Sequence, residues 1–355
     1  MSSFLDSIGA TPRVRASFQP FAAQGLTLAR VSRVDRGAYR ILDETGEELT
    51  AEPTGALLHR ASAPSELPAV GDWAAVRVFQ DFAVLHAILP RSTEIGRRAA
   101  GKREERQILA ANADIVLLIC GLDTEFNPRR LERYLVLVDE SGARPVIVLN
   151  KADLCRDIAA AADEAARIAP HATVVVAQAG APSGIAAVAA QIHPGETAVL
   201  LGPSGAGKST LINRLLGSPR QSTGEVRPHD RRGRHTTTSR QLIPLPQGGV
   251  VIDTPGLREL QLWVGADSVR RTFDDVAQAA AFCRFRDCMH SGEPGCAVAA
   301  ALEDGSLAPD RWDGYLKLIR ELRHHEVAAD ALAAQRNKNR VKQIHKAMRN
   351  MGRGQ

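Results

Sequence analysis

Residues 202–210 read Gly-Pro-Ser-Gly-Ala-Gly-Lys-Ser-Thr, between the apolar run TAVLL (197–201) and the helix-like run LINRLLG (211–217). In a strand–loop–helix setting this is a phosphate-binding loop, where glycines let backbone N–H groups surround phosphate oxygens at a helix N-terminus. Lys208 is expected to bridge the β and γ phosphates, and the Ser209 hydroxyl to ligate Mg²⁺. The expected nucleotide-binding residues of the loop are Gly202, Pro203, Ser204, Gly205, Ala206, Gly207, Lys208, Ser209 and Thr210.

A second motif, Asp253-Thr254-Pro255-Gly256, ends the next apolar strand, VVID. An acidic residue at a strand end near a phosphate loop suits an outer-sphere partner of Mg²⁺. Gly256 would let a backbone N–H reach the γ-phosphate. By itself the motif is also compatible with an ordinary turn.

A third motif, Asn150-Lys151-Ala152-Asp153, directly follows the run PVIVL. The Asp153 carboxylate can accept two hydrogen bonds from guanine N1–H and N2–H₂, a pattern that adenine cannot offer. We expect Asn150 to contact the base and the neighbouring loops, and the stem of Lys151 to stack along the ring. The motifs together predict GTP and GDP as ligands, with Mg²⁺, and disfavour an ATP-dependent kinase or transporter ATPase.

The order of these motifs is unusual, because small GTPases place the phosphate loop first and the guanine motif near the end. Here residues 150–153 precede 202–210, which precede 253–256. The apolar runs alternate with helical stretches, which is typical of a parallel sheet covered on both faces. The sequence therefore predicts an α/β fold with a circularly permuted P-loop GTPase domain.

The segment 218–241 lies where a mobile loop should close on the γ-phosphate. Its hydroxyls at Thr236, Thr237 and Thr238 are candidates for a second Mg²⁺ contact, and we expect Thr237 to make it. The loop is also rich in arginine, which is typical of contact with RNA phosphates or of a solvated charged loop.

Many GTPases carry a water-orienting Gln after Asp-x-x-Gly, but here the residue is Leu257. Hydrolysis is therefore expected to be slow unless another group orients the water. His235, beside the threonines, is the candidate for that group. The alternative interpretation is that His235 is a surface histidine that contacts RNA or solvent. We assign candidate catalytic roles to His235, Lys208 and Thr237.

Three cysteines and a histidine fall close together as Cys283-x₄-Cys288-x-His290-x₅-Cys296, with Gly292, Pro294 and Gly295 for tight turns. Four soft or borderline ligands without an open position suit a closed, structural Zn²⁺ site. The alternative is buried free cysteines beside a surface histidine. We predict one zinc per chain.

The chain has 355 residues, which suggests more than one domain. We expect a flexible N-terminal arm (1–24), a β-barrel (25–90), a basic linker (91–107), the permuted GTPase domain (108–268), a helical zinc-binding domain (269–330) and a basic tail (331–355). Five short strand-like runs predict the barrel. An oligonucleotide/oligosaccharide-binding (OB) barrel and an SH3-like barrel fit it about equally.

The net charge of +5 is uneven, because residues 331–355 hold seven Lys+Arg and no acid, which leaves about −2 for the rest. The tail is interpreted as a disordered segment that binds RNA, or alternatively as an extension that only increases solubility. An odd cysteine count, no signal-like N-terminus and no long apolar run predict a cytoplasmic protein without a membrane partner. We expect a monomer.

With these residues in view, the chain resembles the RsgA (YjeQ) family of small-ribosomal-subunit biogenesis GTPases. The resemblance covers about residues 25–330 and rests on the motif order, GRHTTT at 233–238, DTPG with a following hydrophobic residue, and CRFRDCMHSGEPGCAV at 283–298. It implies an OB-type barrel, a permuted GTPase domain and a C-terminal zinc domain. The family's Ser-containing guanine loop appears here as Ala177-Gln178-Ala179-Gly180. This departure puts in doubt whether a side chain of that loop contacts guanine.

The resemblance also implies GTP hydrolysis stimulated by the small ribosomal subunit, during its late maturation. The partners would be that subunit and its rRNA. An alternative function is an RNA-binding assembly module in which GTP mainly sets the conformation and turns over little.

Overall fold

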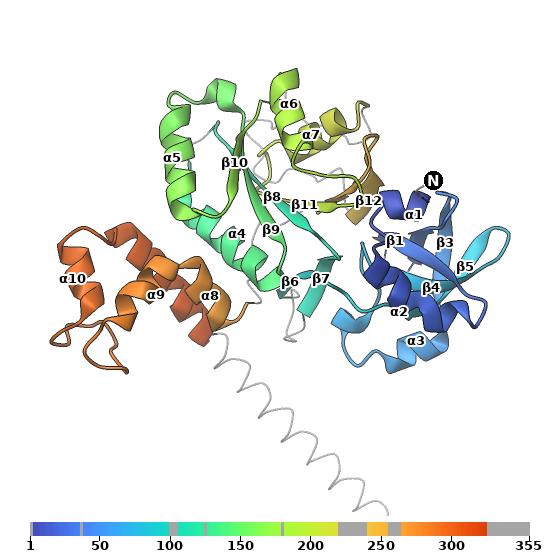
Figure 1. Ribbon diagram of the computed structural model, residues 1–355, viewed down its shortest axis with the longest axis horizontal. Helices are drawn as coiled ribbons and strands as arrows, with labels where there is room; N and C mark the ends of the chain where they lie inside the picture. The colour runs from blue at the N-terminus through green and yellow to red at the C-terminus, as the bar shows by residue number, and fades with distance from the viewer. Residues whose placement is uncertain are drawn as a thin grey trace, which may run out of the picture. The chain divides into compact units, whose positions relative to one another are not determined.

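The computed structural model (Figure 1) describes residues 3–35, 38–98, 106–123, 126–178, 181–218, 240–254 and 264–324. The chain divides into two compact units, Met1–Trp263 and Val264–Gln355. Each unit is described by itself.

The chain begins with helices where we expected a loose arm. Helix α1 (Phe4–Ser7) has a capping box between Ser3 and Asp6, and α2 (Pro12–Ala22) is capped by Thr11. Leu5 and Ile8 are 4% and 1% exposed. The expectation of an irregular segment at 3–24 was wrong, because these short helices depend on caps and buried contacts rather than on a long apolar period.

Strands β1 to β5 form the expected barrel. They are β1 (Thr27–Asp35), β2 (Ala38–Leu42), β3 (Glu48–Pro53), β4 (Trp73–Val78) and β5 (Phe82–Ile88), with α3 (Gly55–Arg60) and the 3₁₀ turn η1 (Pro64–Glu66) between β3 and β4. Their order is β1-β2-β3-β5-β4, and pairing of β1 with β4 closes the barrel. The β3–β5 pair is parallel. This closed five-strand order confirms the OB-type barrel.

The segment expected as a linker, 91–107, contains strand β6 (Glu94–Arg98) and the start of β7 (Arg106–Ala111). The two strands pair antiparallel. Ile95 of this segment is 0% exposed, and Ile108, which follows it in β7, is 5% exposed, whereas the segment as a whole is polar and basic. Pairing between these neighbouring strands and the buried side chains of Ile95 and Ile108 therefore decide the structure of the segment, which composition does not show.

The GTPase sheet has the order β10-β9-β8-β11-β13-β12. Strands β8 (Ile115–Gly121), β9 (Arg144–Asn150), β10 (Thr173–Val176), β11 (Thr197–Leu201) and β13 (Val250–Asp253) run parallel. Strand β12 (Arg240–Pro244) is antiparallel to β13 and also pairs with β1 of the barrel. The alternating apolar runs thus form the predicted parallel sheet.

Helices cover both faces of this sheet (Figure 1). Helices α6 (Pro182–Ala189) and α7 (Lys208–Leu215) pack on the face that carries Ile115, Leu117 and Ile119. Helices α4 (Pro128–Ser141) and α5 (Ile158–Ile168) contact the strands from the other side, and the 3₁₀ turn η2 (Ala152–Leu154) follows β9. Burial on both faces explains why the strands are apolar throughout rather than alternating.

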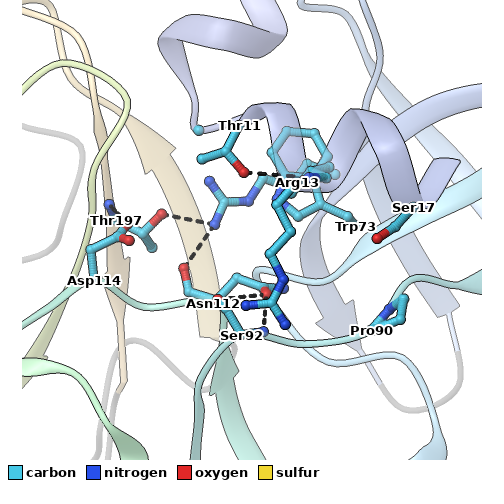
Figure 2. A pocket seen from close by; sticks show the side chains of 12 residues that line it. Thr11, Arg13, Ser17, Trp73, Pro90, Ser92, Asn112, Asp114 and Thr197 are labelled. Atoms are coloured by element: carbon cyan, nitrogen blue, oxygen red, sulfur yellow. Dashed lines mark hydrogen bonds between the residues drawn. The ribbon is translucent and has the colours of Figure 1, made fainter.

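A buried arginine joins the parts of the first unit. Arg30 of β1 is 1% exposed, and its guanidinium donates to Thr197 Oγ1 at 2.8 Å, to Gly71 O at 3.2 Å and to the carbonyl oxygens of Ile8 and Asn112. Figure 2 shows the pocket of about 50 Å³ beside it. Thr197 begins β11, so this pocket lies at the opposite end of the strand from the phosphate loop, and it is too small for a nucleotide.

The second unit is helical. Its described helices are α8 (Ala266–Thr272), α9 (Asp274–Ala281), α10 (Ala297–Glu303) and residues 309–324. The helix of residues 309–324 buries Leu318 and Leu322, and its Trp312 stacks on Tyr315, which contacts Phe273. Residues 325–355, including the predicted basic tail, lie outside the described residues.

Candidate nucleotide site and metal centre

The three nucleotide motifs meet at one edge of the sheet. Asn150 ends β9, the phosphate loop follows β11, and Asp253 ends β13. The register aligns Gly121 with Asn150 across β8–β9 and Leu200 with Asp253 across β11–β13. The carboxyl edge of an open parallel sheet is where ligands bind in this class of fold. The permuted chain order therefore leaves the motifs together in space.

The backbone of the phosphate loop requires its glycines. Gly205 and Gly207 have φ of +84° and +96°, in the left-handed region. A Cβ on Gly202 would lie 2.5 Å from the carbonyl oxygen of Ile119, and one on Gly207 would collide with the amide nitrogen of Asn150. The loop therefore packs directly on β8 and on the guanine motif.

Lys208 is held inside the loop. Its Nζ donates to the carbonyl oxygens of Gly202 at 2.7 Å and Pro203 at 2.8 Å. Burial lowers the pKa of Lys208 and raises the pKa of Asp253, and the attraction between the two charges partly offsets both changes. Thr254 fixes the end of β13 by donating from Oγ1 to Leu200 O at 2.7 Å. A cation and a carboxylate thus face the same loop.

Asn150 links the guanine motif to the phosphate loop. Its side chain is fully buried, and Nδ2 donates to Ala206 O at 2.8 Å. In the described part of the chain, its Oδ1 accepts no hydrogen bond. Ala177, which follows β10 and donates its N–H to Leu149 O, has no hydroxyl to supply one. The buried oxygen is an acceptor that a donor on a bound nucleotide or its hydration shell can satisfy, so the residues fit the ligand.

Lys151 and Asp153 complete the guanine motif. Lys151 has φ of +60°, and its Nζ lies 2.6 Å from Asp123 Oδ2. Asp153 is exposed, with its carboxylate open to a ligand. Sequence reasoning missed Asp123. The signal was available, because Asp123 closely follows the buried run IVLLICG, just as Asn150 ends the neighbouring strand.

Several predicted site residues lie outside the described residues. These are His235, Thr237 and its threonine neighbours, Gly256, Leu257, and Ala179 and Gly180 of the guanine loop. Their predicted roles stay predictions. Ser209 and Thr210 are described, at the start of α7, and both are partly exposed on the loop side of the helix.

The four predicted metal ligands converge in the second unit. The ligand atoms of Cys283, Cys288, His290 and Cys296 all lie within 4.8 Å of one another. His290 Nδ1 lies 3.5 Å from the Sγ of Cys283 and 3.4 Å from that of Cys296. Zn–S and Zn–N bonds of about 2.3 and 2.0 Å at tetrahedral angles would put sulfur and nitrogen about 3.5 Å apart. The cluster therefore fits a zinc ion.

The loop around the cluster is shaped for these ligands. His290 has φ of +57°, and Gly292 and Gly295 have φ of +107° and +79°. The Glu293 carboxylate accepts from the backbone N–H groups of Met289 at 2.9 Å and Ser291 at 2.6 Å. The His290 ring also meets the edge of Trp312 at 5.7 Å between centroids. Much of this loop is therefore shaped by its turns and by hydrogen bonds to the Glu293 carboxylate.

Comparison with known proteins decides the family. A profile of the RsgA GTPase family matches residues 88–263. The chain is 48% identical over 356 residues to the "Small ribosomal subunit biogenesis GTPase RsgA" of Opitutus terrae, with 97% of each chain covered. The chain belongs to the RsgA GTPase family. A second RsgA relative, from Syntrophotalea carbinolica, is 43% identical and covers 99% of this chain and 100% of its own.

Solved RsgA-type structures share the fold. The chain resembles the crystal structure of YjeQ from Thermotoga maritima with a TM-score of 0.63 at 25% identity, which covers 84% of this chain and 98% of that one. It resembles YloQ, described as a circularly permuted GTPase, with a TM-score of 0.60 at 26% identity and coverage of 84% and 96%. Together with the strand order, these findings confirm the permuted RsgA architecture.

Proposed function

We propose that this protein, as an RsgA-family GTPase, acts in the biogenesis of the small ribosomal subunit and hydrolyses GTP in response to that subunit late in assembly. The relatives matched over nearly the whole chain are named small ribosomal subunit biogenesis GTPases, which supports the general function, while stimulation by the subunit and the late stage are our proposal. The observation that carries the proposal for this chain is the Asn150–Ala206 hydrogen bond. This hydrogen bond joins the proposed guanine motif, residues 150–153, to the phosphate loop. A guanine-specific hydrolase needs these two parts to bind the same nucleotide.

The described residues suggest a division of roles. Lys208 would exchange its carbonyl partners for β- and γ-phosphate oxygens, so that its charge remains satisfied in both states. Ser209 and Asp253 would hold magnesium, which neutralises phosphate charge when it is bound. Asp153 would read the guanine edge, while Lys151, held by Asp123, would lie along the ring.

Hydrolysis itself would depend on the partner. Leu257 stands where many GTPases carry the water-orienting Gln, and a hydrocarbon side chain cannot orient water. We assign that task to His235 and the second magnesium contact to Thr237. The bound subunit would bring these residues into their catalytic arrangement and so switch hydrolysis on.

The remaining proposals concern the cellular setting. We propose that the second unit holds one structural zinc, and that the protein is a cytoplasmic monomer that contacts rRNA. Among the described helices, none is long and apolar enough to cross a bilayer.

GTP turnover with and without purified small ribosomal subunits tests the proposed function. Small subunits are expected to raise kcat at least tenfold, because a group supplied or ordered by a partner is worth about 10³–10⁵ in GTPase rates. Large subunits at the same concentration are the control. Equal rates with and without small subunits would favour the assembly module that turns over little GTP, and equal stimulation by both subunits would contradict small-subunit specificity.

Asp153→Asn is expected to change the base that the protein recognises. An Asn side chain offers N–H groups toward guanine N2–H₂, so GTP affinity should fall about 100-fold or more, since each hydrogen bond to a charged group is worth about 1.5–3 kcal/mol. Xanthine carries a carbonyl at C2 and should gain affinity. Fluorescent GDP and XDP analogues measure both changes. Asp163→Asn, an exposed change on α5, is the matched control and should leave both affinities unaltered.

A further inference from the structure

The pocket beside Arg30 is lined by three parts of the first unit (Figure 2). Arg13 and Ser17 come from helix α2, and Arg30 and Trp73 come from the barrel. Thr197 contributes the wall at the start of β11. None of the described residues of the three nucleotide motifs lines this pocket. Its volume of about 50 Å³ has room for about three to five waters, and so for the four oxygens of one small oxyanion.

Arg30 is a buried cation without a counter-ion in contact. Each of the four hydrogen bonds that its guanidinium donates goes to a neutral oxygen, and it contacts no carboxylate among the described residues. The ring centroid of Trp73 lies 5.0 Å from Cζ. Burial lowers the pKa of Arg30 to about 10, although Asp114 and Asp72 act against that change. The group therefore stays charged at pH 7, where burial of a cation is costly without an anion beside it.

One N–H of this guanidinium has no acceptor in the described part of the chain. An arginine side chain offers five N–H donors, one on Nε and two on each Nη. Nε donates to Gly71 O and Nη1 to Ile8 O. Nη2 donates to Asn112 O and to Thr197 Oγ1. The second N–H of Nη1 is left, and because a buried donor without a partner is costly, an acceptor in the pocket would be favourable.

The wall of the pocket is positive and rich in donors. Arg13 is exposed and pairs with no carboxylate among the described residues, and Figure 2 shows its side chain extending along the pocket. The hydroxyl of Thr11 accepts from the backbone at the start of α2, so its own proton can be donated to a ligand. Of the described residues that line the pocket, Asp114 alone is acidic, and its Oδ2 accepts from Thr197 N at 2.8 Å. Two cations thus face one acid.

We propose that this pocket binds a small tetrahedral oxyanion, such as inorganic phosphate, between the guanidiniums of Arg30 and Arg13. The anion would neutralise the charge of Arg30 and accept the remaining N–H of its Nη1, whereas water would supply an acceptor without the charge. The first turn of α2 adds the positive end of a helix dipole, which favours the same ligand. This site goes beyond the proposed function, since it lies at the end of β11 opposite to the phosphate loop.

Calorimetric titration of the full-length protein with inorganic phosphate tests the site. A non-hydrolysable GTP analogue with Mg²⁺ fills the phosphate loop, so that the pocket is the remaining site. We expect saturable binding of one phosphate per chain, and a melting temperature of the first unit that rises with phosphate concentration. Arg13→Ala should weaken binding about tenfold, which is typical of one solvent-exposed charge-assisted hydrogen bond. Arg13→Lys, which keeps the charge, should retain most of the affinity.

Ser17→Glu is an independent second variant. A carboxylate at this half-buried position would face the anion and should prevent saturable binding. Arg60→Ala is the matched control, because Arg60 is an exposed arginine of α3 that does not line the pocket. Melting temperatures without phosphate show that each variant is folded. Phenyl phosphate identifies the source of the anion, since equal binding would assign the site to the terminal phosphate of a larger molecule and weaker binding to the free ion.

The proposal would be overturned by a lack of saturable phosphate binding to the wild type, or by unchanged affinity in both Arg13→Ala and Ser17→Glu. Equal stabilisation by chloride at the same ionic strength would also overturn it. The GTP analogue tests the proposed function separately. If the analogue did not bind, that function would fail, and the same titration on Lys208→Ala would still test the pocket.

Discussion

Lys208→Ala is expected to abolish measurable GTP hydrolysis. Removal of a preorganised positive group at a transferring phosphoryl group costs about 10²–10³ in rate, and the same change weakens binding of the charged phosphates. We therefore expect kcat/KM to fall by about 10³ or more. Single-turnover hydrolysis and equilibrium binding of a fluorescent GTP analogue separate the loss in rate from the loss in affinity.

The structure indicates that this variant will fold. Lys208 is the first residue of α7, where alanine is a good helix former, and among the described residues its ammonium donates only to the loop carbonyls of Gly202 and Pro203. Lys317→Ala, an exposed lysine of the second unit, is the matched control. Turnover by Lys208→Ala within tenfold of the wild type would show that the loop does not bind phosphate as we infer.

Loss of zinc is expected to unfold the second unit. In small zinc domains, binding of a structural zinc contributes about 10–16 kcal/mol of apparent folding free energy at pH 7. This exceeds what the few buried side chains near residues 283–296 can supply. Cys296→Ser should therefore reduce the metal content below about one zinc per chain and expose the loop to protease. Trp312 meets the edge of the His290 ring, so its fluorescence should report the change.

The metal prediction has an internal control. Cys155 belongs to the first unit and is not one of the four clustered ligands, so Cys155→Ser should keep a full zinc content and the wild-type fluorescence of Trp312. Full zinc in Cys296→Ser, measured by elemental analysis, would contradict a four-ligand site. Because the ligands lie in the second unit, Cys296→Ser should still bind GDP, which distinguishes loss of this unit from loss of the whole fold.

Some predictions failed or stayed open because the structure there depends on helix caps and strand pairing, which composition does not show. Helix Phe4–Ser7 has a capping box and buries Leu5, helix Pro12–Ala22 is capped by Thr11, and strand β6 forms because it pairs with β7. Composition could not separate an OB barrel from an SH3-like one. The parallel β3–β5 pair and the closing β1–β4 pair decide that question, and both join residues far apart in the chain.

The sequence by itself determined the chemistry of the sites. Gly202–Thr210 and Cys283–Cys296 are local segments, in which spacing and glycine positions fix how donors and ligands converge. Only the tertiary structure decided that the permuted motifs meet at one edge of the sheet. The Asn150–Ala206 bond spans 56 residues, and the Lys151–Asp123 pair joins neighbouring strands. Such contacts depend on strand order and register, which arise from burial across the whole sheet and leave no local pattern to read.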